Sequence, residues 1–97
     1  MKTLDEIKDI LAQHKEELEQ RYKVKGTGIF GSYVRGEQRK RSDVDILVEF
    51  EQPLGLFKFM DLEDYLAALI GTKVDLVSKV ALKPRIGEHI LKGVVYL

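Results

Sequence analysis

The sequence predicts a small α/β (α+β) sandwich, and three observations support that fold class. Segments with helical spacing of apolar residues alternate with short strand-like runs, in the order α-β-α-β-α-β-α. The 97 residues suffice for one domain with its own core. Apolar residues make up 44% of the chain and charged residues 33%, which is typical of a globular protein. We therefore expect residues 1–97 to form one domain, with a small mixed sheet of about three strands and about four helices.

The bulk composition excludes several classes of function. Sixteen basic side chains balance sixteen acidic ones, so the basic excess typical of nucleic-acid-binding proteins is missing. The chain has no cysteine, which excludes disulfides, thiolate metal sites and a cysteine nucleophile. No apolar run approaches the roughly 18 residues of a membrane span, and the N-terminus does not resemble a secretory signal. These features predict a cytoplasmic protein that neither enters a membrane nor binds nucleic acid directly.

The N-terminal segment, residues 3–22, is predicted to form one helix. Thr3 and Glu6 have the spacing of a capping box, in which each side chain accepts a hydrogen bond from the other residue's backbone amide. Apolar residues then recur at helical intervals, with Glu and Lys between them. Gly26 is expected to stop the helix shortly afterwards.

Two strand-like runs follow, separated by a turn and a polar loop. Residues 24–30 predict a short strand, which two internal glycines weaken. Gly31 then permits a sharp turn or a close approach of the backbone to a ligand, and Ser32 to Arg35 can begin a brief helix. Residues 36–42 are polar and basic and are expected to form a loop. Residues 44–50 predict a second strand, whose alternating apolar residues line one face.

The second half of the chain adds two helices and a third strand. Residues 56–70 predict a helix, and residues 73–78 predict a strand with Asp75 in its middle. Pro84 suits the first turn of a final helix, and residues 93–97 form either a small extra strand or a tail that docks on a partner. The apolar stripe of the 56–70 helix is expected to consist of Leu56, Phe59, Met60, Leu66, Leu69 and Ile70.

The predicted topology brings three aspartates to one end of the sheet. If the first two strands pair antiparallel, the glycine–serine turn after the first lies next to Asp43 before the second. The long connection to the third strand suits a parallel crossover, which places Asp75 beside Asp43 and Asp45. On a strand, Asp43 and Asp45 point to the same face with Cα atoms roughly 6.7 Å apart. Carboxylates that close repel each other unless a cation lies between them, so we interpret the pair as a metal site.

The spacing Gly31-Ser32, ten residues, Asp43-x-Asp45 meets the requirements of phosphoryl or nucleotidyl transfer. Mg²⁺ binds one or two carboxylates together with phosphate oxygens of the substrate. A glycine–serine turn offers backbone N–H groups and a hydroxyl to the outer phosphates. Asp75 can bind a second metal or deprotonate the attacking hydroxyl. Taken singly, Asp43 is a turn residue and Asp45 a solvated edge residue, but the combination favours the functional interpretation.

Two residues close to this turn have open roles. Arg35 either neutralises the charge of a triphosphate or belongs to a solvated loop of alternating charges. Tyr33 either stacks on a base or packs in the core.

The stretch GSYVRGEQRKRSDVDILVEF resembles the signature of the DNA polymerase β-type nucleotidyltransferase superfamily, in particular its minimal nucleotidyltransferase (MNT) branch. The downstream stretch KVDLVSKVALKPRIGEHILKGVVYL is also similar to that branch, so the resemblance covers essentially the whole chain. It implies a polymerase β-like core that binds ATP and two Mg²⁺ ions. Gly31 and Ser32 would then hold the phosphates with Arg35 beside them, and Asp43, Asp45 and Asp75 would be the catalytic metal ligands.

The resemblance also implies a biological role. Members of the MNT branch are antitoxins of HEPN-domain ribonuclease toxins, and they transfer AMP from ATP to a tyrosine of the toxin. This chain would then be the antitoxin of a type VII-like toxin–antitoxin pair and would form a hetero-oligomer with its toxin. Two alternatives stay open: a non-catalytic antitoxin that neutralises its partner by binding alone, and a nucleotidyltransferase that acts on a small molecule. The short chain favours an acceptor surface that comes largely from another molecule.

Overall fold

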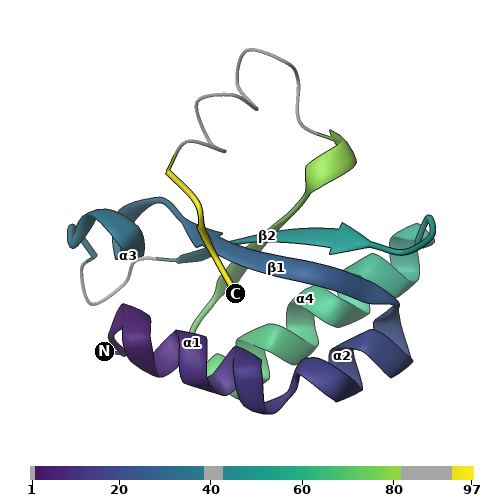
Figure 1. Ribbon diagram of the computed structural model, residues 1–97, viewed down its shortest axis with the longest axis horizontal. Helices are drawn as coiled ribbons and strands as arrows, with labels where there is room; N and C mark the ends of the chain where they lie inside the picture. Colours follow the sequence, from purple (N-terminus) through teal and green to yellow (C-terminus); the bar gives the residue numbers. More distant parts are fainter. Residues whose placement is uncertain (1, 39–42, 82–92) are drawn as a thin grey trace.

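The computed structural model describes residues 2–38, 43–81 and 93–97, which form a four-stranded mixed sheet with helices packed against it (Figure 1). In chain order the elements are α1 (Leu4–Gln13), α2 (Lys15–Tyr22), β1 (Val24–Phe30), α3 (Ser32–Arg35), β2 (Val44–Phe50), α4 (Leu56–Ile70), β3 (Val74–Ser78), the 3₁₀ helix η1 (Lys79–Ala81) and β4 (Val95–Tyr96). Helices α1, α2 and α4 lie together on one face of the sheet (Figure 1). The α+β fold class expected from the sequence is confirmed.

The sheet has the strand order β3-β2-β1-β4. Strand β1 runs antiparallel to both β2 and β4, whereas β2 runs parallel to β3 after the crossover through α4. Both pairings expected for the first three strands are therefore present. Val95–Tyr96 pairs with β1, so the C-terminal segment is an extra strand and makes the sheet one strand wider than expected.

Helix α1 begins with the predicted capping box. The Glu6 N–H donates to Thr3 Oγ1 at 3.2 Å, and the Thr3 N–H donates to Glu6 Oε1 at 3.1 Å. These bonds satisfy two backbone amides that would otherwise have no acceptor at the start of the helix. The Thr3 hydrogen bonds also hold the pKa of the Glu6 carboxyl below its usual value.

The prediction of one helix over residues 3–22 is wrong, because the chain leaves helical geometry at His14. This residue has φ −105° and ψ 11°, and its ring Nδ1 lies 2.8 Å from the Ile10 carbonyl oxygen, to which its own N–H donates at 3.3 Å. A side chain that shares the i−4 carbonyl with its own amide competes with the helical bond pattern. Helix α2 ends at Tyr22, as predicted, but the residue that stops it is Lys23, which adopts a left-handed conformation with φ 58°, and not Gly26, which lies inside β1.

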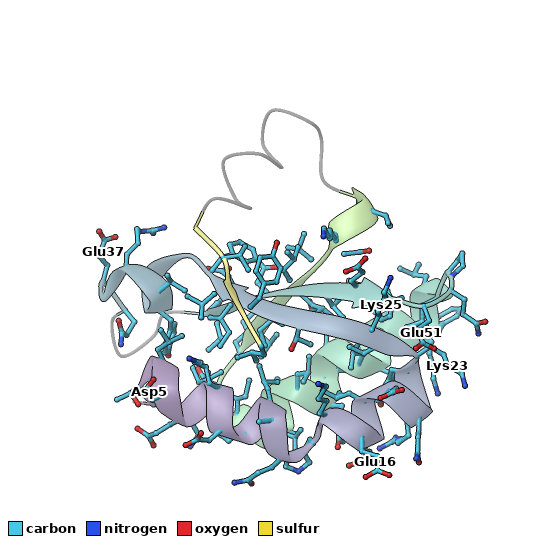
Figure 2. The ribbon with its side chains drawn as sticks, viewed as in Figure 1. Asp5, Glu16, Lys23, Lys25, Glu37 and Glu51 are labelled. Atoms are coloured by element: carbon cyan, nitrogen blue, oxygen red, sulfur yellow. The ribbon has the colours of Figure 1, made fainter. Side chains whose placement is uncertain are left out.

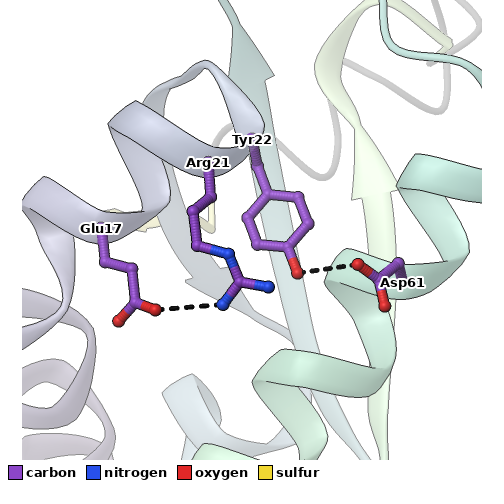
Figure 3. A network of polar contacts seen from close by, with 4 residues as sticks. All are labelled: Glu17, Arg21, Tyr22 and Asp61. Atoms are coloured by element: carbon purple, nitrogen blue, oxygen red, sulfur yellow. Dashed lines mark hydrogen bonds and ion pairs between the residues drawn. The ribbon is translucent and has the colours of Figure 1, made fainter.

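The second helix is joined to α4 by a buried tyrosine. The Tyr22 side chain is fully buried, and its hydroxyl donates to Asp61 Oδ2 at 3.0 Å (Figure 3). The Arg21 guanidinium donates to Glu17 at 3.0 Å and lies over the Tyr22 ring, 5.1 Å from its centroid. Burial, followed by the bond to Asp61, raises the pKa of the Tyr22 hydroxyl. The contact fixes α2 against α4 beneath the sheet.

The core lies between the sheet and the three long helices. Strand β2 contributes three side chains to it from one face, as its alternating sequence predicts. Leu47 is also buried, although it points to the opposite face of β2. The buried apolar residues of the core are Ile7, Leu11, Leu18, Tyr22, Val24, Ile29, Tyr33, Val44, Ile46, Val48, Leu62, Leu66, Ile70, Val74 and Leu76.

The expected apolar stripe of α4 is only partly correct. Leu56 and Met60 are 70% and 52% exposed, whereas Leu62, which had no predicted role, is completely buried with Leu66 and Ile70. The first turns of α4 follow the loop after β2 at the margin of the sheet, and the later turns pass beneath it (Figure 1). Burial along α4 therefore depends on which turns the sheet covers, in addition to the apolar period.

The predicted final helix near Pro84 lies outside the described residues, as does part of the predicted loop 36–42. In the described part of the chain, every helix is too short or too polar to traverse a lipid bilayer.

Candidate active site

The sheet register brings the predicted site residues to one end of three adjacent strands, β1, β2 and β3. Phe30 at the end of β1 pairs with Asp45 on β2, so the following residue, Gly31, lies beside the start of β2. On the other side of β2, Asp45 pairs in parallel register with Asp75 on β3. Neighbouring strands are about 4.8 Å apart, so Asp45 lies between the glycine–serine turn and Asp75. The juxtaposition expected from the topology is present.

Gly31 is required at its position for two physical reasons. Its φ of 78° and ψ of −148° form a backbone conformation that is open almost only to glycine. A Cβ atom on Gly31 would also collide with the carboxylate of Asp45. The Gly31 carbonyl accepts hydrogen bonds from the Val34 and Arg35 amides, both at 3.2 Å, and so starts α3. The turn therefore holds its backbone directly against the Asp45 side chain.

The electrostatics of this end of the sheet are dominated by carboxylates. Burial raises the pKa of the half-buried Asp45, the negative charges of Asp75 and Asp43 raise it further, and the Arg35 guanidinium opposes the shift. Asp43 is partly balanced by Lys73, whose Nζ lies 4.0 Å from Asp43 Oδ2, but this lysine is 81% exposed. A cation bound among these aspartates would relieve their repulsion.

The donor set fits Mg²⁺ in its chemistry, because hard carboxylate oxygens are the ligands that this ion prefers. Asp43 directly precedes β2, Asp45 lies on β2, and Asp75 lies on the adjacent strand β3, so these are the residues that would hold such an ion. In the residues that the structure describes, no group of three or more His, Cys, Asp or Glu side chains is already arranged to hold a metal. In the conformations described, the side chains of Asp43, Asp45 and Asp75 therefore do not form a complete coordination shell.

Strand β3 is held in place from the helical layer. The Leu76 N–H donates to Glu63 Oε2 on α4 at 2.9 Å. An amide on the outer side of an edge strand would otherwise lack an acceptor. Because Leu76 follows Asp75 directly, this bond fixes the position of the third aspartate.

The other residues predicted for the site, Ser32, Arg35 and Tyr33, differ in their exposure and in their contacts. Ser32 starts α3 next to Gly31 and is half-buried. Arg35 is exposed, and its Nε donates to Glu37 Oε2 at 2.9 Å. Tyr33 is only 4% exposed and belongs to the core, which supports the packing role and not the stacking role.

Two charged neighbours, Glu37 and Lys73, were not predicted from the sequence. Lys73 could have been found from the strand register, because it precedes Val74, which pairs with Val44 next to Asp43. Glu37 carries no comparable signal, because its contact with Arg35 depends on how the chain turns after α3.

A cavity of about 490 Å³ lies away from the aspartates, at the far end of β2. Its mostly apolar lining includes Phe50, Leu56, Phe59 and Val80, and none of the three aspartates contributes to it. Its size does not make it the candidate active site, since its lining, as the structure describes it, has Glu51 as a single charged residue and offers phosphate chemistry neither a pair of carboxylates nor a cationic side chain.

A glycine–serine turn packed against an aspartate on an antiparallel neighbour, with another aspartate on the adjoining parallel strand, is the core of a polymerase β-type nucleotidyltransferase. Comparison with known families agrees: the family described as "Nucleotidyltransferase domain" matches residues 11–97. The chain belongs to the nucleotidyltransferase domain family, and its enzymatic class is therefore nucleotidyl transfer.

Individual relatives match over nearly their whole length. The protein adenylyltransferase MntA of Thermococcus cleftensis is 55% identical over 97 residues, which cover 100% of this chain and 98% of the relative. A solved structure provisionally described as a minimal nucleotidyltransferase is 34% identical with a TM-score of 0.76, and the match covers 94% of this chain and 95% of that one.

Two solved toxin–antitoxin structures share the fold at lower identity. One, described as a toxin–antitoxin with AMP-PNP, is 24% identical with a TM-score of 0.75 and covers 88% of this chain and 69% of that one. The other is a tri-AMPylated Shewanella oneidensis HEPN toxin in complex with MNT antitoxin; it is 20% identical with a TM-score of 0.69 and covers 93% of this chain and 70% of that one. At these identities the likeness concerns the fold alone.

Proposed function

We propose that this protein is an Mg²⁺-dependent adenylyltransferase that transfers AMP from ATP to a tyrosine of a HEPN-domain toxin and thereby acts as its antitoxin. The observation that carries the proposal is the position of Asp45, between the Gly31 backbone and Asp75. The naming of a 55% identical relative as a protein adenylyltransferase supports a protein acceptor. The fold shared with MNT–HEPN complexes supports a toxin as that acceptor.

The glycine–serine turn is assigned to the phosphates of ATP. At the start of α3 the first backbone N–H groups have no acceptor within the helix, so they are available to phosphate oxygens. Ser32 adds its hydroxyl, and Arg35 adds a guanidinium suited to phosphate. Because Gly31 has no side chain, a triphosphate can approach the turn closely.

Asp43 and Asp45 are assigned to the metal, with Asp75 as the third carboxylate and the base. When bound, Mg²⁺ polarises the phosphate and compensates the charge that develops on the leaving group. Asp75 is exposed while Asp45 is half-buried, so Asp75 is the carboxylate that an incoming acceptor meets first. Asp75 takes the proton of the acceptor hydroxyl, whose oxygen forms a bond to the α-phosphorus as the bond to pyrophosphate breaks.

The test is intact-mass measurement of the HEPN partner after incubation with Mg-ATP and this protein. We expect the partner to gain the mass of one or more AMP groups, and we expect no gain with Asp43→Asn combined with Asp45→Asn. The ribonuclease activity of the partner, measured in parallel, separates transfer from occlusion. If the double variant still silences the ribonuclease without adding mass, the protein neutralises its partner by binding alone and the proposed transfer is not its mode of action.

A further inference from the structure

The guanidinium assigned to the triphosphate already has an anionic partner within the protein. Arg35 Nε donates to Glu37 Oε2 at 2.9 Å, which is the short distance of a charge-assisted hydrogen bond. Both side chains are more than half exposed. A carboxylate and a phosphate present similar pairs of oxygens to an arginine, so the two compete for the same donor atoms.

The position of Glu37 is fixed by the turn that ends α3. Gly36 adopts a left-handed conformation with φ 71°, and its N–H donates to the Ser32 carbonyl. The Glu37 N–H donates to the same carbonyl at 2.9 Å. The backbone of Glu37 is thus tied to Ser32, one of the residues assigned to the phosphates, and its side chain is returned toward Arg35.

We propose that Glu37 is an internal substitute for the triphosphate: its carboxylate binds Arg35 in the nucleotide-free protein, and phosphate oxygens displace it when nucleotide binds. This inference rests on the proposed function and adds to it a residue that sets nucleotide affinity. Glu37 does not touch the reacting atoms, so it is a positioning residue.

The charge balance supports this direction of effect. The site already contains three aspartates, and the positive charge of Arg35 opposes the rise in the pKa of Asp45 that burial and the other two aspartates cause. A glutamate beside Arg35 lowers the positive potential that an incoming polyanion meets, and it must give up its bond before the Nε–H of Arg35 can turn to a phosphate. Because an exposed ion pair is weak, this competition adjusts affinity and does not block binding.

The experiment measures the Kd of AMP-PNP by titration calorimetry in the presence of Mg²⁺. We expect Glu37→Gln to lower this Kd by about two- to fivefold, which is the strength of an exposed ion pair. The effect should be smaller for AMP, which carries less charge. Glu51→Gln is the matched control, because this glutamate is also exposed but lies at the opposite end of the molecule (Figure 2). The Kd of AMP-PNP for the Glu51→Gln variant should equal that for the unsubstituted protein.

A double-mutant cycle with Arg35→Met distinguishes competition for Arg35 from a general effect of charge. With Arg35 removed, Glu37→Gln should change the Kd little, while the Tm of each variant in the absence of nucleotide stays close to that of the unsubstituted protein. An unchanged or higher Kd for Glu37→Gln would overturn this inference alone. So would an equal fall in Kd when Glu37→Gln is introduced into the Arg35→Met protein. Absence of AMP transfer to the HEPN partner despite normal nucleotide binding would overturn the proposed function and leave this inference intact.

Discussion

Asp45 on β2 and Asp75 on β3 are direct neighbours in parallel register, so two carboxylates from distant parts of the sequence share one edge of the candidate site. The backbone of Gly31 closes the other side of Asp45. The protein therefore holds like charges together in a half-buried place, where their repulsion opposes folding. Such strain is typical of functional sites, whose residues are arranged for a ligand and not for stability.

The first prediction concerns the stability of Asp45→Asn. Burial and the neighbouring aspartates raise the pKa of Asp45 above its ordinary value of 3.8, so its ionised form is disfavoured in the folded protein. Its contribution to stability is therefore greatest below the pKa of the unfolded chain and is lost as pH rises through the folded pKa. At neutral pH, with chelator present, the variant should be more stable by no more than about 1 kcal/mol, since the carboxylate is partly exposed.

Thermal unfolding in chelator checks this prediction, with Asp64→Asn as the control, an exposed aspartate on α4. The increase in Tm that Asp45→Asn produces should become smaller as pH falls below the range in which aspartate ordinarily titrates. A lower Tm for Asp45→Asn than for the unsubstituted protein at neutral pH would contradict the charge repulsion inferred for this site.

The second prediction is that Gly31→Ala disrupts the site. The alanine must adopt a positive φ and also displace the Asp45 side chain, so we expect a loss of about 2 kcal/mol or more in the free energy of unfolding, together with loss of nucleotide binding. Gly71→Ala is the comparison, because Gly71 also has a positive φ, of 80°, but lies in the left-handed region with ψ 20° and has free space around it. Denaturant unfolding should show the smaller loss for Gly71→Ala; equal losses would mean that neither the Gly31 backbone conformation nor the collision with Asp45 adds a cost.

The third prediction compares two apolar residues of α4. Leu62 is completely buried, so Leu62→Ala should lower the free energy of unfolding by about 2–5 kcal/mol. Phe57 is 87% exposed, and Phe57→Ala should change it by no more than about 0.5 kcal/mol. Equilibrium denaturation of both variants provides the measurement. A large loss for Phe57→Ala would mean that this side chain is covered in the protein in solution.

Sequence patterns predicted the elements whose formation depends on residues close together in the sequence. Strands β1 and β2 and helices α3 and α4 have the expected bounds, because alternation, glycine positions and apolar spacing all act over a few residues. The approach of Asp75 to Asp45 was predictable because a helix-containing connection favours a parallel crossover. The break at His14 was not predictable from apolar spacing, since it involves a contact between the imidazole ring and the Ile10 carbonyl.

Tertiary position accounts for the other differences. The apolar period marks Leu56 and Met60 as it marks Leu66, but only the later turns of α4 lie under the sheet. The pairing of Arg35 with Glu37 requires the turn at Gly36, which brings two residues close in sequence into a specific contact. The roles of the aspartates, the turn and Arg35 remain predictions, because they depend on ligands.

The fourth prediction concerns alkaline pH and Tyr65. Burial, followed by a hydrogen bond to Glu17, raises the pKa of Tyr65 from 10.0 to about 12. Because the unfolded chain ionises first, the contribution of Tyr65 to stability should be constant below pH 10 and should fall as pH rises from 10 towards 12. Tyr65→Phe should reduce this alkaline loss, whereas Tyr96→Phe on the exposed edge strand should preserve it. Denaturant unfolding across this range is the measurement, and an undiminished loss in Tyr65→Phe would contradict the assignment.

The last prediction separates nucleotide binding from transfer at Asp75. Asp75 is exposed on β3, whereas Asp45 is packed against the Gly31 turn, so the two carboxylates should differ in their effects when each is replaced by asparagine. Loss of a general base lowers a rate by about 10²–10⁴-fold, so Asp75→Asn should slow AMP transfer to the HEPN partner by that factor and change the Kd of Mg-AMP-PNP only severalfold. Asp45→Asn should weaken both binding and transfer. Calorimetric titration together with single-turnover transfer measures the two effects. An equally large loss of binding in Asp75→Asn would instead make Asp75 chiefly a ligand of the metal that carries the nucleotide, and the proton of the acceptor would then require another base.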